Sequence, residues 1–125
     1  EAIAQVGEKV EMKSAGVVTV KVDADKPWQD TGVKLQKGVT YLITAEGEWL
    51  VHPKTGFVSA DGIESKYQGI RAHCLIGKIN NSEFFKIGKK LEFKASESGN
   101  LKMQANDNGL GDNKGTLTVT IRRLK

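Results

Sequence analysis

Apolar and polar residues alternate with a period of two along much of this chain. The apolar members of the four clearest runs are Val18, Val20 and Val22; Tyr41, Ile43 and Ala45; Leu101, Met103 and Ala105; and Leu117, Val119 and Ile121. Such alternation gives a strand one apolar and one polar face, as in antiparallel sheets that are packed on one side. The segments 73–79, 84–87 and 90–93 are predicted to be further strands.

Turn signals separate the strands, and no segment combines helical spacing with a cap and a stop. The chain has 14 glycines, and short turn sequences occur at 36–38, 46–47 and 98–99. This spacing predicts a β-sandwich or an open barrel. The segment 53–68 is the longest irregular stretch, and a loop of that length in a compact domain is often functional.

Length and composition fit one domain over residues 1–125. No apolar run approaches the roughly 18–20 residues that span a bilayer, so we expect no membrane insertion. The sequence at 1–5 does not resemble a signal peptide and looks more like a mature or trimmed N-terminus, which is compatible with an earlier export signal. We therefore expect a secreted or periplasmic bacterial protein.

The charge pattern and the cysteine content argue against a nucleic-acid partner and against an internal disulfide. The net charge is +4, but 19 lysines and arginines are spread along the chain among 15 acids, and aromatic residues make up only 6%. Nucleic-acid sites gather positive charge and aromatic rings on one face, so no nucleic-acid partner is expected. Cys74 is the single cysteine, which excludes an internal disulfide, and its apolar neighbours favour a small buried hydrophobe.

Catalytic and zinc-binding patterns are lacking, so we expect no enzyme. Ser96 and Ser98 have no recognisable nucleophile elbow, and only two histidines exist to act as a base. The spacing of His52, His73 and Cys74 fits no strong zinc pattern. The chain has two tryptophans. Trp49 is predicted in the core, and Trp28 either covers the edge of the sandwich or forms a platform for a sugar.

The segment 106–115, Asn-Asp-Asn-Gly-Leu-Gly-Asp-Asn-Lys-Gly, joins the strand ending near Ala105 to the strand starting near Thr116. It offers two carboxylates and two carboxamides within residues 107–113. Calcium takes about six to eight oxygen ligands of these kinds, and a cation between two close acids relieves their repulsion. The same residue types also build ordinary β-turns without a metal, so both interpretations stay open at this point.

The chain resembles the small calcium-dependent galactose-binding bacterial lectins of the PA-IL-like family. The matching segments are Gly47-Glu48-Trp49, Leu75–Ile79, Ser98–Leu101, Asn106-Asp107 and, most specifically, Asp112–Ile121. The resemblance covers roughly residues 16–122. It implies an all-β fold, an antiparallel β-sandwich with a galactose-binding-domain-like jelly roll, and a calcium ion that contacts a sugar directly.

Carried over by position, the resemblance implies a metal site and an adjoining sugar site. The implied calcium ligands are Asp107, Asp112, Asn113 and the backbone oxygens of His52 and Leu110. The implied carbohydrate-binding residues are Gln68, Tyr67, Asn108, Asp107 and Asp112.

Three departures from the family weaken the galactose prediction more than the calcium prediction. The 107–115 loop is shorter than the family's, Asp112 stands where an Asn is expected, and only Gln68 matches the family's His and Gln pair. The predicted function is a calcium-dependent carbohydrate-binding module for a galactose-like glycan, as a homo-oligomer or as part of a larger secreted protein. The alternative is a non-catalytic structural or protein-interaction module of a secreted protein, in which calcium only makes the loop rigid.

Overall fold

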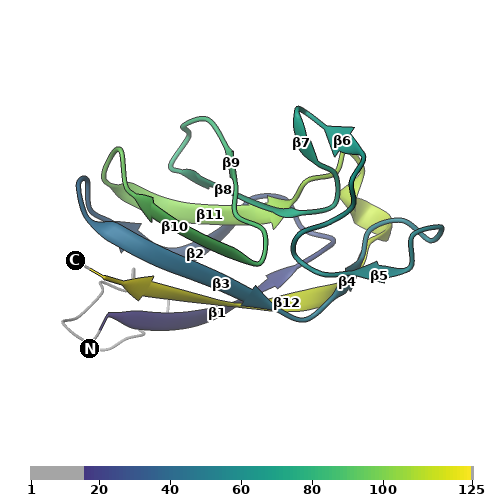
Figure 1. Ribbon diagram of the computed structural model, residues 1–125, viewed down its shortest axis with the longest axis horizontal. Helices are drawn as coiled ribbons and strands as arrows, with labels where there is room; N and C mark the ends of the chain where they lie inside the picture. The colour runs from purple at the N-terminus through teal and green to yellow at the C-terminus, as the bar shows by residue number, and fades with distance from the viewer. Residues whose placement is uncertain (1–15, 125) are drawn as a thin grey trace.

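Two antiparallel sheets face each other in the computed structural model, which describes residues 16–124 (Figure 1). The first sheet runs in the order β10 (Lys90–Lys94), β3 (Thr40–Glu46), β12 (Lys114–Arg123), β4 (Trp49–Leu50) and β5 (Phe57–Val58), and β1 (Val17–Asp23) also pairs with β12. The second sheet runs in the order β2 (Gln29–Leu35), β11 (Gly99–Ala105), β8 (Leu75–Ile79) and β9 (Phe85–Lys86). A hairpin of β6 (Lys66–Tyr67) and β7 (Ile70–Arg71) stands apart from both sheets. The predicted all-β antiparallel sandwich is confirmed.

The core lies between the two sheets and uses the alternating apolar positions. The apolar residues of the runs in β3, β11 and β12 are all buried, and Val22 of β1 is buried with them. Val18 and Val20 are half-buried and pack against the same core. Trp49 is fully buried in this cluster, as predicted.

Three details of the strand prediction differ from the structure. β2 was not among the predicted strands, because its first half is polar and contains Gly32 where the pairing with β11 changes register. The segment predicted from residue 73 starts at Leu75 instead, since His73 has φ 67, which a strand does not allow. The segment 53–68 is less irregular than expected, as it contains β5 and the whole of β6.

β12 connects the parts of the first sheet. Its residues 116–122 pair with β1. Its residues 118–123 also pair with β3, and Lys114 and Gly115 at its start pair with β4. Gly115 makes the close passage beside β4 possible: its φ is +97, and a Cβ there would lie 3.0 Å from the Trp49 Cα. This passage brings the start of β12 to the end of the sandwich where the 106–113 loop begins and ends.

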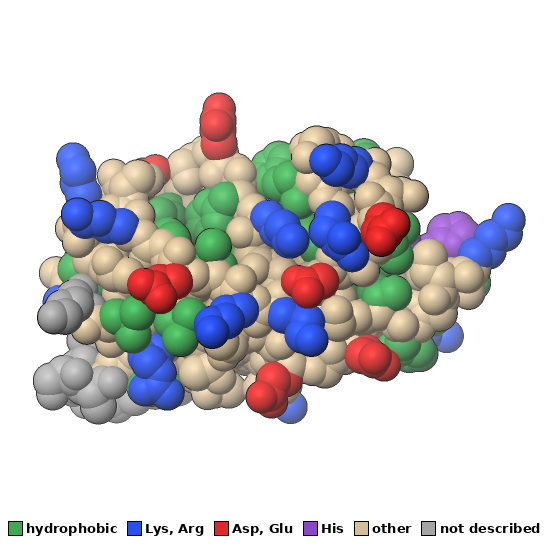
Figure 2. Space-filling view, viewed as in Figure 1, with side chains coloured by type: hydrophobic (Ala, Val, Ile, Leu, Met, Phe, Trp, Pro, Cys, Tyr) green, Lys and Arg blue, Asp and Glu red, His purple; other side chains and the backbone are tan. Residues whose placement is uncertain are grey.

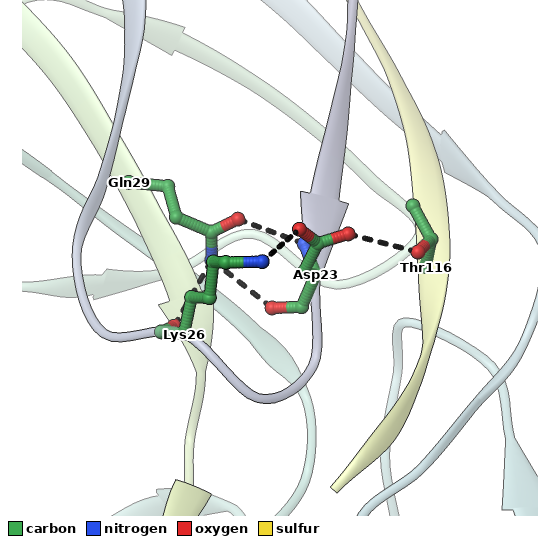
Figure 3. Close-up of polar contacts among 4 residues, drawn as sticks. All are labelled: Asp23, Lys26, Gln29 and Thr116. Carbon is green, nitrogen blue, oxygen red and sulfur yellow. Dashed lines mark hydrogen bonds and ion pairs between the residues drawn. The ribbon is translucent and has the colours of Figure 1, made fainter. Parts of the chain in front are cut away.

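A polar turn after β1 fixes the segment 24–28 (Figure 3). The Asp23 carboxylate pairs with Lys26 Nζ at 3.1 Å and accepts a hydrogen bond from Thr116 Oγ1 at 2.9 Å. The contact with Lys26 has the largest effect and lowers the Asp23 pKa, and the hydrogen bond from Thr116 lowers it further. The Gln29 side chain bonds both backbone groups of Asp23 and the Lys26 carbonyl at 2.8–3.0 Å. The turn is therefore held from both of its ends.

Acidic and basic side chains are interspersed on the face of the molecule seen in Figure 2, with apolar side chains between them. No helix within residues 16–124 is long and apolar enough to cross a membrane.

Candidate ligand-binding site

The loop between β11 and β12 has a defined backbone. A single turn of 3-10 helix covers Leu110–Asp112, and the Asn113 N–H donates to the Leu110 carbonyl oxygen at 3.0 Å. Asn108 and Asp112 are exposed on this loop, whereas Asn113 is only 4% exposed. The loop therefore directs its last residue inward and two polar side chains toward solvent.

Asn113 joins the loop to the turn after β1. Its Nδ2 donates to the Ala24 carbonyl oxygen at 2.9 Å and to Asp107 Oδ2 at 3.2 Å. Its Oδ1 is buried and has no hydrogen-bond partner among the described residues. The structure thus brings together two of the predicted metal ligands, Asp107 and Asn113, and leaves one amide oxygen unsatisfied beside them.

Asn106 ties the β6–β7 hairpin to the start of the loop. This side chain is fully buried, and its Nδ2 donates to the carbonyl oxygens of Tyr67 at 2.9 Å, Arg71 at 3.0 Å and Ile70 at 3.3 Å. Its Oδ1 accepts a hydrogen bond from Gln68 Nε2 at 2.9 Å. Two predicted carbohydrate-binding residues, Tyr67 and Gln68, are thereby held next to the residue that precedes Asp107.

Asn106 was not among the predicted site residues, although it is the main polar anchor of this region. Its position before Asp107 in an Asn-Asp-Asn-Gly segment looks like ordinary turn chemistry. Its burial depends on the hairpin folding over it from residues 67–71, and that contact leaves no periodic signal in the sequence.

The two predicted backbone ligands are engaged within the chain. The His52 carbonyl oxygen accepts hydrogen bonds from the Thr55 N–H at 3.1 Å and from Thr55 Oγ1 at 2.9 Å. The Leu110 carbonyl oxygen accepts one hydrogen bond, from Asn113. A carbonyl oxygen has two lone pairs, so the Leu110 carbonyl retains one lone pair that could bind a cation. The His52 carbonyl already accepts two hydrogen bonds, so it would have to give up one of its hydrogen bonds from Thr55 to bind a cation. Both roles stay predictions.

His73 lies next to the start of the loop, and hydrogen bonds of its own backbone groups hold it there. Its N–H donates to the Asn106 carbonyl oxygen, and its own carbonyl accepts the Trp49 Nε1–H, both at 2.9 Å. Its Nδ1 is buried without a hydrogen-bond partner among residues 16–124. Burial lowers the His73 pKa, the Asp107 charge opposes that shift, and His52 adds slightly to it. The imidazole is therefore kept neutral beside the loop.

Cys74, His52 and His73 do not form a zinc site. No group of three or more His, Cys, Asp or Glu side chains within the described residues is arranged to hold a metal ion. Cys74 is fully buried, and burial raises the pKa of its thiol to about 11. The prediction that it is a small buried hydrophobe is confirmed.

Several oxygen atoms in the loop before β12 are of the chemical kind that a hard cation such as calcium takes as ligands. An unpaired buried amide oxygen costs roughly 1–3 kcal/mol, and coordination of Asn113 Oδ1 would remove that cost. The Asp107 carboxylate, which accepts a hydrogen bond from the Nδ2 of the same amide, carries negative charge, and the exposed Asp112 and the Leu110 carbonyl lie on the same short loop. Calcium prefers carboxylate, amide and backbone oxygens of this kind.

Comparison with solved structures gives this architecture a precedent. The chain matches a structure described as "EclA N-terminal domain; PllA-like lectin", with a TM-score of 0.74 over 89% of this chain and 100% of that one. The chain has the fold of a PllA-like lectin. The sequence identity is 23%, so the likeness establishes the fold. It confirms, at that level, the resemblance to the PA-IL-like lectins.

Comparison by sequence gives no such match. No protein-family model matches the chain, and neither does any curated protein sequence. Within the lectin fold, the contacts of Asn106 and Asn113 bring the 106–113 loop, the β6–β7 hairpin and the turn after β1 to one end of the sandwich.

Proposed function

We propose that the protein is a calcium-dependent carbohydrate-binding module without catalytic activity. The observation that carries this proposal is the buried, unpaired Oδ1 of Asn113, in an amide whose Nδ2 is hydrogen-bonded to the Asp107 carboxylate. Support comes from the lectin fold and from the hairpin that Asn106 holds against the same loop.

The residues of the site divide into two groups by chemistry. Asp107, Asp112 and Asn113 would hold the ion through side-chain oxygens, with the Leu110 and His52 carbonyls as further donors. When bound, calcium supplies coordination positions for two neighbouring sugar hydroxyls. Asp107 and Asp112 would accept hydrogen bonds from those hydroxyls, which are strong because the acceptor is charged.

The hairpin and the loop tip would select the sugar. Gln68 and Tyr67 lie on the hairpin beside the loop, and Asn108 is exposed at the loop tip. We propose a galactose-like glycan as the ligand and secretion by a bacterial cell. Binding to a multivalent glycan would gain avidity if the protein forms homo-oligomers or is attached to a larger secreted protein.

Calorimetric titration of the EDTA-treated protein with calcium tests the metal site. We expect wild-type protein to bind calcium and Asp107→Ala to lose binding by at least about 100-fold, because a carboxylate ligand is removed. Glu92→Ala is the matched control, since it removes one exposed carboxylate from β10. Absence of calcium binding in the wild type would contradict the proposal and make the loop an ordinary turn.

Galactose is then titrated into the calcium-loaded protein. Heat that disappears with EDTA supports a ligand bridged by calcium. Calcium binding with no response to any sugar would instead favour the alternative, a structural or protein-interaction module in which the ion only makes the loop rigid.

A further inference from the structure

The outer face of the second sheet gathers positive charge. Its outward positions carry four lysines and one aspartate, namely Lys34, Lys78, Lys86, Lys102 and Asp30. Lys102 is central, because it lies opposite Lys78 on β8 and opposite Asp30 on β2. Asp30 already accepts hydrogen bonds from the Gly32 N–H at 2.9 Å and from Asn100 Nδ2 at 3.2 Å. Among the charged residues at these outward positions, lysines outnumber the single aspartate four to one.

Trp28 lies on the same face, partly exposed and outside the hydrophobic core. Its backbone N–H donates to Gln104 Oε1 on β11 at 2.9 Å, which places it beside the outward positions of that strand. The Lys78 ammonium lies 4.5 Å from the centroid of the Trp28 ring. The turn of Figure 3, which ends at Gln29, holds the segment that carries the indole. An aromatic ring and an ammonium group are thus positioned together before any ligand binds.

The outer face of the first sheet is different. Its outward positions carry both signs of charge: Lys21 lies in a row with Thr118 and Glu46, Arg122 lies in a row that includes Glu92, and Lys90 lies in a row with threonines only. Concentrated charge beside an aromatic ring is therefore a property of the second sheet and not of strand surfaces throughout this molecule.

We propose that this basic face, defined by Trp28, Lys34, Lys78, Lys86 and Lys102, is a second binding site, which takes an acidic oligosaccharide. The apolar face of a sugar ring packs on an indole, while carboxylates on the sugar pair with lysine ammonium groups. The amide side chains of β11 lie among these lysines and suit sugar hydroxyls. Sites for single-stranded nucleic acid use a series of stacking aromatics, whereas one tryptophan lies here, so a glycan fits better.

This site uses no residue of the proposed calcium site, so its ligand binds without calcium. The test is a titration of the protein in EDTA with a hyaluronan hexasaccharide, which alternates uronate and neutral sugars. We expect binding that weakens as salt is raised. Lys102→Ala and Trp28→Ala should each weaken it by about tenfold, since each removes one of the two contacting groups.

Matched controls separate a defined site from general charge attraction. Lys21→Ala removes the same charge from the first sheet and should leave affinity unchanged, as should Asp107→Ala. Trp28→Phe, which keeps an aromatic ring, should retain most of the binding and also excludes misfolding as the cause. Four results would overturn the proposal. The first two are no binding of the hyaluronan hexasaccharide, and a loss of affinity in Lys21→Ala as large as that in Lys102→Ala. The other two are equally strong binding of a neutral chitin hexasaccharide, and tighter binding of an oligothymidylate than of the hyaluronan hexasaccharide.

Discussion

Buried side chains with unpaired polar atoms are the most informative single residues of this protein. Asn113 Oδ1, in the 106–113 loop, and His73 Nδ1, on the residue whose N–H bonds the start of that loop, are buried without hydrogen-bond partners among the described residues. Such atoms are rare in folded proteins, and each calls for an explanation such as strain, a functional role or an ion. For Asn113 the explanation we propose is calcium, and for His73 it is a neutral imidazole that burial keeps uncharged.

The pH dependence of stability should report on His73. Because burial lowers its folded pKa below the ordinary value of about 6.5, the unfolded chain takes up the proton first as the pH falls. The stability that the neutral imidazole provides is thus present above that ordinary value and is lost as the pH falls through the folded pKa. His73→Asn, which tolerates the positive φ, should flatten this loss.

Urea midpoints in EDTA at pH 7.5 and pH 5.0 measure this effect. Asp107 and His52 are the charged groups that act on His73, and they stay in place in the variant. Equal loss of stability in wild type and His73→Asn would show that the imidazole does not titrate on unfolding.

Cys74 should be chemically inert in the folded protein. With a pKa of about 11 its thiolate fraction at pH 8 is roughly 200-fold lower than that of an ordinary thiol, and the sulfur is also buried. Labelling with a thiol reagent at pH 8 should therefore proceed only as fast as the chain opens. Prompt labelling of native protein would contradict the burial of this residue.

At the scale of elements, alternation predicted those strands whose apolar faces build the core, such as β3, β11 and β12. It did not predict β2, because the first half of that strand is polar and a register shift interrupts its pairing with β11. The two-residue strands β5, β6 and β7 are too short for a period to appear, and tertiary contacts define them. The candidate loop was recognised from its residue types, but the partners of Asn113 and Asn106 come from distant segments.

Removing the Asn106 side chain should release the β6–β7 hairpin. Four hydrogen bonds to residues 67–71 are lost in Asn106→Ala, and we expect destabilisation by about 3 kcal/mol. Asn108→Ala, an exposed change on the same loop, should stay within about 0.5 kcal/mol of wild type. Urea denaturation measures both, and similar stability of the two variants would argue against an anchoring role.

Gly62 should resist substitution because the segments 60–63 and 72–74 lie in close contact. A Cβ there would lie 2.2 Å from the Ala72 carbonyl oxygen and 2.5 Å from the Cys74 nitrogen, with φ at +70. Gly56 has the same φ, but a Cβ there would have no atom within 4 Å. Gly56→Ala therefore measures only the free-energy cost of placing a Cβ on a left-handed backbone, about 1–2 kcal/mol. Gly62→Ala should unfold at a clearly lower temperature than Gly56→Ala, and equal melting temperatures would contradict the contact.

At the scale of the whole molecule, the sandwich has two proposed binding surfaces, one end and the outer face of the second sheet. One end joins the 106–113 loop, the β6–β7 hairpin and the turn after β1, while the two outer faces differ in charge. The sandwich was predictable because strand alternation is a local property. The basic face was not, because Trp28, Lys78 and Lys102 come from different strands and their proximity depends on register.

Galactose titration of the same protein, first loaded with calcium and then stripped with EDTA, tests the central claim most directly. We expect heat of galactose binding in the calcium-loaded protein, its loss after calcium is stripped, and its recovery when calcium is returned. Binding of galactose that is equally strong in both states would contradict a sugar held through calcium at Asp107 and Asn113.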